Sequence, residues 1–219
     1  MAEYPYDYAT RRGVHPVSWE DYHGICKALA QAASRFGPQI VLAVGRGGYY
    51  PGTLIAHILQ VELYPVRLSR RVHDVVQYAR PRWLVEPPAL VEGCRVLVVD
   101  EICDSGETLT MVAEKVASLG AREVRSAVMY AHTRGASVPD YVGLITDALL
   151  LNPWDREILR EGRFCFHPEY VRALAEQGMA PDASLLIQAT PVVLAKGAGA
   201  GSGGDGSGAG GGAGEGEGD

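Results

Sequence analysis

Thirteen residues in the middle of the chain carry the groups best suited to chemistry. The run from Val96 to Thr108 begins with apolar residues, continues with the acids Asp100 and Glu101, and ends in a turn of small and polar residues that starts at Asp104. Adjacent carboxylates suit the vicinal hydroxyls of a sugar or a hydrated divalent cation, because carboxylate oxygens accept hydrogen bonds and are hard metal ligands. The acid pair therefore predicts a diol or cation site.

The turn that follows the acid pair predicts an anion site. Ser105 and Thr108 supply hydroxyls, and the helix expected after them supplies backbone N–H groups and the positive end of its dipole. Phosphate is the natural occupant, and a diol site beside a phosphate site describes a pocket for ribose 5-phosphate. An ordinary strand-to-helix turn would explain the two hydroxyls but not three acids beside them.

A second glycine-rich turn, Gly45 to Gly48, follows an apolar run. It lacks the third glycine of a dinucleotide fingerprint because Tyr50 occupies that position, and the chain has no Gly-Lys-Ser/Thr sequence of a P-loop. It also has no Gly-x-Ser-x-Gly nucleophile elbow. These absences from the sequence exclude the main competing motifs.

Helical and strand patterns alternate around these turns. Ser18, with Asp21 three residues later, predicts a capped helix that ends at Gly37-Pro38. Residues 66–90 predict edge strands or a long mobile loop. We further expect strands at 40–44, 95–99 and 123–130, and helices at 52–59 and about 108–119.

This alternation predicts an α/β fold with a mostly parallel central sheet flanked by helices. Ligands bind beyond the carboxyl ends of the strands in such sheets. Both glycine-containing turns follow strands at such ends, so we expect them to face one site.

Composition limits the other possibilities. A formal charge of −6 and no basic stripe argue against nucleic acid. The four cysteines are scattered, which indicates neither zinc nor disulfides. The N-terminus lacks a signal-peptide pattern and no apolar run is long enough to span a bilayer, so we expect a cytoplasmic protein without a membrane partner. We expect an N-terminal extension at 1–16, one domain at 17–190 and a flexible Gly-rich tail at 191–219.

The run from Val96 to Thr108 resembles the signature of type I phosphoribosyltransferases, which is a hydrophobic strand, two acids and Asp-Thr/Ser-Gly-x-Thr. The sequence from Val44 to Gly52 resembles the pyrophosphate loop of the xanthine-guanine branch, and Val17-Ser-Trp-Glu resembles its first helix start. Pro139-Asp-Tyr and Asn152 to Asp155 resemble its hood, a small subdomain expected at about 131–170. The resemblance covers roughly residues 17–155.

The resemblance implies a glycosyltransferase that joins a base to the ribose of phosphoribosyl pyrophosphate and releases pyrophosphate, in purine salvage. It implies Mg²⁺, held largely by substrate oxygens and water with Asp100 and Glu101 nearby, and it implies a homodimer. Asp104 is implied as the catalytic residue that faces the base. The implied ribose and 5-phosphate residues are Asp100, Glu101, Asp104, Ser105, Gly106, Glu107 and Thr108, and the implied pyrophosphate residues are Arg46, Gly47, Gly48 and Arg82, with Arg80 as the alternative to Arg82.

The base site departs from the branch. Purine members use a hood lysine and often a stacking aromatic residue, whereas this chain has no lysine around His132 to Arg134 and has Leu149 at the stacking position. Leu149 or Leu150 could cover the base, and His132 or Arg134 could donate to a carbonyl. The expected base is a 6-oxopurine such as xanthine, guanine or hypoxanthine. A non-purine acceptor and a non-catalytic sensor of phosphoribosyl pyrophosphate or nucleotides remain the alternatives.

Overall fold

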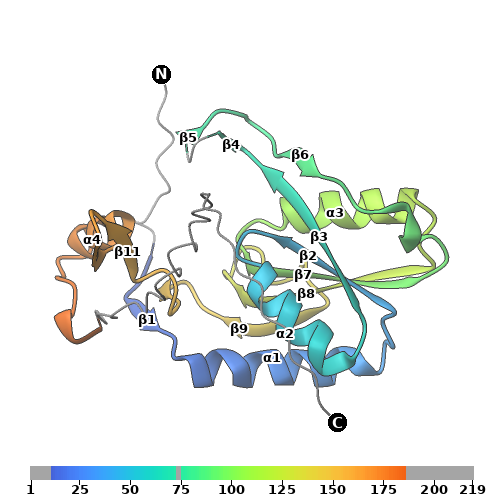
Figure 1. Ribbon diagram of the computed structural model, residues 1–219, viewed down its shortest axis with the longest axis horizontal. Coiled ribbons are helices and arrows are strands. Elements are labelled where there is room, and N and C mark those ends of the chain that lie inside the picture. Colours follow the sequence, from blue (N-terminus) through green and yellow to red (C-terminus); the bar gives the residue numbers. More distant parts are fainter. Residues whose placement is uncertain (1–10, 73–74, 186–219) are drawn as a thin grey trace, which may run out of the picture. The chain divides into compact units, whose positions relative to one another are not determined.

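The computed structural model describes residues 11–72 and 75–185, and its centre is a six-stranded sheet in the order β6-β3-β2-β7-β8-β9 (Figure 1). Neighbouring strands are parallel except at the edge, where β6 runs antiparallel to β3. The arrangement confirms the predicted α/β fold with a mostly parallel sheet. The strands are β2 (Ile40–Gly45), β3 (Glu62–Ser69), β6 (Arg82–Val85), β7 (Arg95–Cys103), β8 (Glu123–Ala131) and β9 (Tyr141–Ile145).

Helices flank the sheet on both faces. The helices α1 (Trp19–Ser34) and α2 (Tyr49–Leu59) pack on one face, and α3 (Glu107–Ser118) packs on the other (Figure 1). Along β7, Leu97 faces the first layer and Val98 the second, which is why this strand is apolar at every central position. None of the helices in the described ranges has the length and apolar character needed to cross a membrane.

The hood region contains four further elements, and a fifth from the N-terminal segment pairs with one of them. The strand β1 (Val14–Pro16), at the end of the predicted extension, pairs in parallel with β10 (Leu149–Leu151). A hairpin of β11 (Glu157–Arg160) and β12 (Arg163–Phe166) leads into α4 (Pro168–Glu176). The remaining short elements are β4 (Arg71–Val72), β5 (Val75–Val76) and the 3₁₀ turns η1 (Ala89–Val91) and η2 (Ala183–Leu185).

One aromatic cluster ties this region to the main sheet. The Trp154 ring stacks on Tyr50 of α2 with the ring centroids 4.0 Å apart, and it meets Tyr22 of α1 edge-on at 4.8 Å. Trp19 lies 5.5 Å away on a third side. The cluster packs Trp154 of the hood region against the helices α1 and α2.

The boundaries differ from the sequence prediction in three places. The strand β3 begins at residue 62 and lies inside the sheet, where we expected a loop or edge strand from residue 66. Its Pro65 is tolerated because β6 pairs with β3 only from Arg67 onward, so one side of β3 is an open edge at the proline. The helix α2 begins at Tyr49 rather than Gly52, and β7 continues through the acid pair to Cys103. The predicted tail at 191–219 lies outside the described residues.

Candidate active site

The acid pair lies in the second half of β7, a strand between β2 and β8. The Asp100 Oδ1 accepts the Glu101 N–H at 2.7 Å. Burial nevertheless raises the pKa of Asp100 to about 7. Burial, followed by the charges of Asp155 and Asp100, raises the pKa of Glu101 to about 8. Hydroxyl donors or a cation beside these carboxylates would stabilise their ionised forms, which burial disfavours.

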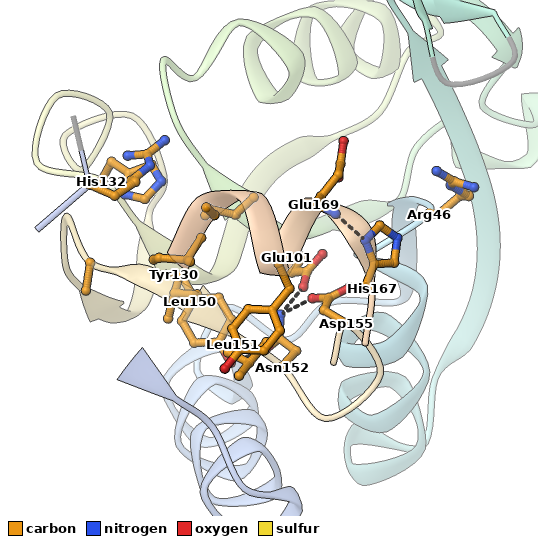
Figure 2. A pocket seen from close by; sticks show the side chains of 16 residues that line it. Arg46, Glu101, Tyr130, His132, Leu150, Leu151, Asn152, Asp155, His167 and Glu169 are labelled. Atoms are coloured by element: carbon orange, nitrogen blue, oxygen red, sulfur yellow. Dashed lines mark hydrogen bonds between the residues drawn. The ribbon is translucent and has the colours of Figure 1, made fainter. Parts of the chain in front are cut away.

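One amide holds the far end of the acid pair. The Asn152 Nδ2 donates to Glu101 Oε1 and, at 3.1 Å, to Asp155 Oδ2 (Figure 2). The Tyr130 hydroxyl donates to Asn152 Oδ1 at 2.9 Å, and both of these residues are buried. Sequence reasoning missed this network, although Asn152 and Asp155 belong to a motif that it had already noted. The network fixes the position of Glu101 from the hood side.

The glycine-rich turn after β2 packs directly on the acid pair. A Cβ at Gly47 would overlap the Glu101 carboxylate, and a Cβ at Gly48 would overlap the Val44 carbonyl oxygen and stand 2.9 Å from the Asp100 Cα. Only glycine fits at either position. The turn after β2 and the acid pair of β7, which are more than fifty residues apart in the sequence, therefore meet at the carboxyl ends of adjacent strands.

The predicted anion turn opens α3. Gly106 has a φ of +84°, which favours glycine, and a side chain there would also crowd Val138. The Ser105 hydroxyl accepts the Glu107 N–H at 3.4 Å. The N–H groups of a first helical turn have no partners inside their helix, so this turn can bind an anion.

Asp104 is held by arginine. Its carboxylate accepts hydrogen bonds from Arg134 Nε, at 2.8 Å, and from Arg134 Nη2, and Arg11 Nη2 lies 3.7 Å from its Oδ1. The predicted base-facing acid is thus part of an ion-pair cluster. Arg134 contacts this acid and is largely exposed.

A cavity of about 310 Å³ adjoins these groups (Figure 2). Of the predicted site residues, Arg46, Glu101, Leu149 and Leu150 line it, and His132 lines it too. The hood supplies a wall that sequence reasoning missed, because the amphipathic pattern of α4 carries no chemical motif. That wall includes His167, Glu169 and Tyr170.

Comparison with known proteins identifies the chain. A family model described as a phosphoribosyl transferase domain matches residues 18–159, a span that contains both turns. The chain belongs to this family.

Curated phosphoribosyltransferases of the xanthine-guanine branch are among its relatives, as the resemblance predicts. The xanthine-guanine phosphoribosyltransferase of Nitratidesulfovibrio vulgaris strain Hildenborough is 29% identical over 150 residues, which cover 67% of this chain and 88% of the relative. The enzyme of that name from Ruegeria sp. strain TM1040 is 27% identical over 157 residues, covering 66% and 86%.

Solved structures agree on the fold. The purine phosphoribosyltransferase from Pyrococcus horikoshii Ot3 has a TM-score of 0.60 and 26% identity, and the match covers 68% of this chain and 99% of that one. The xanthine-guanine-hypoxanthine phosphoribosyltransferase of Helicobacter pylori has a TM-score of 0.56 at 19% identity, covering 66% and 93%, and shows the fold alone. The predicted phosphoribosyltransferase fold and transferase class are confirmed.

In this phosphoribosyltransferase the predicted site residues separate into two groups. Gly47 and Gly48 lie against the acid pair, so the glycine-rich turn and the two carboxylates are neighbours. Asp100, Asp104 and residues 105–108 do not line the cavity itself. Arg82 also lies apart from it, on the edge strand β6, with its guanidinium 4.0 Å above the Tyr78 ring.

Proposed function

We propose that this phosphoribosyltransferase transfers the 5-phosphoribosyl group of phosphoribosyl pyrophosphate to a ring nitrogen of a 6-oxopurine, namely xanthine, guanine or hypoxanthine, in purine salvage. The observation that carries the proposal is the contact of Gly47 with the Glu101 carboxylate beside a cavity lined by Leu149 and Leu150. The names of the curated relatives support the choice of a purine.

Different site residues bind the ribose, the 5-phosphate and the pyrophosphate of the donor substrate. Asp100 and Glu101 accept hydrogen bonds from the ribose hydroxyls. Ser105 to Thr108 bind the 5-phosphate at the start of α3, whose dipole favours an anion. Arg46, Gly47 and Gly48 bind the pyrophosphate, because close approach of backbone N–H groups requires glycine and a guanidinium matches phosphate oxygens. Arg82 reaches the pyrophosphate only if the edge strand β6 and the segment before it move inward.

The reaction exchanges one bond at the ribose C1. The C1–O bond to pyrophosphate breaks with its electron pair leaving on oxygen, and a base nitrogen forms the new C1–N bond. Positive charge develops on the sugar at the transition state, and the carboxylates of Asp100 and Glu101 stabilise it. Asp104 accepts the N–H proton that the base loses. Its ion pair with Arg134 keeps the Asp104 carboxylate oriented before the reaction.

The donor set fits Mg²⁺. Asp100 and Glu101 offer hard carboxylate oxygens; burial raises the pKa of both, and the charges of Asp155 and Asp100 add to the effect at Glu101. The described residues contain no cluster of three or more metal-binding side chains. A site of this kind suits an ion that keeps several waters and substrate phosphates as ligands. When bound, Mg²⁺ would neutralise charge on the departing pyrophosphate.

Pyrophosphate release from phosphoribosyl pyrophosphate and Mg²⁺, measured with a panel of purines and pyrimidines, tests the proposal. We expect release with at least one 6-oxopurine and a loss of roughly 100-fold in kcat for Asp104→Asn. Glu114→Gln is the matched control, because Glu114 is an exposed acid on α3. Release only with a non-purine base would favour the alternative acceptor. Binding of phosphoribosyl pyrophosphate without release from any base would favour a sensor.

A further inference from the structure

His132 is a buried polar residue for which the proposed reaction has no role yet. It follows the last residue of β8, is 2% exposed and lines the cavity together with Leu149 and Leu150 (Figure 2). Its backbone N–H donates to the Cys103 carbonyl at 3.0 Å, and its ring Nδ1 lies 2.8 Å from the Thr146 carbonyl oxygen. The His132 backbone is therefore held at the end of β7, and its ring is held at the end of β9.

The contact with Thr146 determines which ring nitrogen carries the proton. A carbonyl oxygen can only accept a hydrogen bond, so Nδ1 must be the donor. In the neutral ring Nε2 is then left with a lone pair. This Nε2 is buried and has no hydrogen-bond partner among the described residues.

Within the described residues, the groups around the ring supply no donor to Nε2. An imidazolium would place a second, unpaired N–H in a buried position, which is costly. The Asp147 carboxylate is 3.9 Å from Nδ1, beyond hydrogen-bond distance, and it already accepts the backbone N–H and hydroxyl of Thr133. Arg11 lines the same cavity and adds positive charge there. His132 therefore lines the cavity with a ring whose Nε2 is a buried acceptor without a donor among the described residues.

We propose that His132 Nε2 accepts a hydrogen bond from an N–H on the six-membered ring of the bound base, which makes His132 a specificity-determining residue. The inference rests on the proposed function, because it assumes that the cavity beside Leu149 holds the base. The lactam N–H of a 6-oxopurine satisfies Nε2, whereas an edge that carries only acceptors leaves it unpaired. Because Nε2 is enclosed, the base displaces the side chains that cover it as it enters.

Two bases and two variants test this role. Hypoxanthine carries the lactam N–H, and 1-methylhypoxanthine lacks it. His132→Gln places a neutral acceptor near the former Nε2, whereas His132→Leu fills similar volume with no acceptor. We expect His132→Leu to lower kcat/KM for hypoxanthine about 10-fold and to change that for 1-methylhypoxanthine little. His132→Gln should retain most of the discrimination, and the KM for phosphoribosyl pyrophosphate should stay unchanged in both variants. If the ratio of kcat/KM for hypoxanthine to that for 1-methylhypoxanthine is the same in the wild type and both variants, the proposal is overturned.

Two readouts that need no turnover separate this inference from the proposed function. Nitrogen NMR of the labelled wild-type protein at neutral pH should show His132 protonated at Nδ1 and bare at Nε2, and the opposite tautomer or an imidazolium would overturn the proposal. Calorimetric binding of hypoxanthine should weaken about 10-fold in His132→Leu alone. If that pattern appears without pyrophosphate release, the proposed function fails and the role of His132 stands. If hypoxanthine does not bind to the wild type, the role of His132 is refuted.

Discussion

At the scale of single residues, Asn152 links the acid pair to the hood through its side-chain hydrogen bonds. Its amide donates to Glu101 and Asp155 and accepts from Tyr130. We expect Asn152→Leu to lower the free energy of unfolding by about 2–3 kcal/mol, because it leaves buried polar groups unpaired. Tyr130→Phe removes only the neutral hydrogen bond and should lower it by about 1 kcal/mol. Urea unfolding monitored by circular dichroism measures both values, and equal losses would contradict this account.

Gly47 offers a test of the contact between the glycine-rich turn and the acid pair. A methyl group at Gly47 would overlap the Glu101 carboxylate, so Gly47→Ala must displace the acid from its position. We expect a loss of about 100-fold in kcat/KM, since misplacement by about 1 Å has effects of this size. Steady-state assays of pyrophosphate release provide the measurement.

Gly24→Ala is the matched control for that substitution. Gly24 lies inside α1 with no atom near an added Cβ. The control should keep full activity and raise the free energy of unfolding by about 0.5–1 kcal/mol, because alanine favours a helix. Equal activity of the two alanine variants would show that the turn does not need its glycine.

At the scale of elements, the start of α1 depends on a reciprocal cap. The Ser18 hydroxyl accepts the Asp21 N–H at 3.0 Å and donates to the Asp21 carboxylate at 2.7 Å. We expect Ser18→Ala to lower the free energy of unfolding by about 1 kcal/mol near neutral pH.

The effect of this cap should depend on pH. The hydrogen bonds from the Ser18 side chain and backbone lower the pKa of Asp21. The stabilisation that Asp21 contributes is therefore complete above its unfolded pKa of about 3.9 and is lost as the pH falls through the lower folded value. Unfolding of wild type and Ser18→Ala at several acidic pH values should show their difference shrinking as the pH falls. A difference that stays constant throughout this range would argue against the carboxylate's part in the cap.

The elements were predictable where pattern and local chemistry agreed. The Ser18 cap, the buried strands β2 and β8 and the helix α3 follow from apolar runs with clear ends. The strand β3 was not predictable, because its polar residues and Pro65 do not form a strand pattern. Its position between β2 and β6 explains why these residues are tolerated there.

The site was predictable where one short segment carries it. The acid pair and the anion turn are contiguous in the sequence, so their chemistry is visible there. The Asn152 network and the α4 wall depend on how the hood folds back, which no local pattern encodes. The lone pair on His132 Nε2 depends likewise on the contact of Nδ1 with the Thr146 carbonyl, which is fourteen residues away.

At the scale of the whole molecule, substrate binding should stabilise the fold through mass action. Phosphoribosyl pyrophosphate with Mg²⁺ at about 100 times its Kd should raise the free energy of unfolding by about 2.7 kcal/mol. Removing Mg²⁺ with a chelator should abolish most of this gain, because the pyrophosphate would then meet Asp100 and Glu101 without a cation between them. Thermal melting with and without the chelator measures the effect, and an undiminished shift after chelation would speak against Mg²⁺ at this site.

The pairing of β1 with β10 has a consequence for how the protein is made. Val14 pairs with Leu149, so the first strand of the described chain waits for a partner 135 residues later. At ribosomal rates of about 5–20 residues per second, that wait lasts on the order of 10 s. The strands β2, β3, β7 and β8 emerge earlier and can pair meanwhile. On the ribosome, the part of the molecule that carries the acid pair and the two glycine-containing turns therefore takes shape before the hood wall of the cavity.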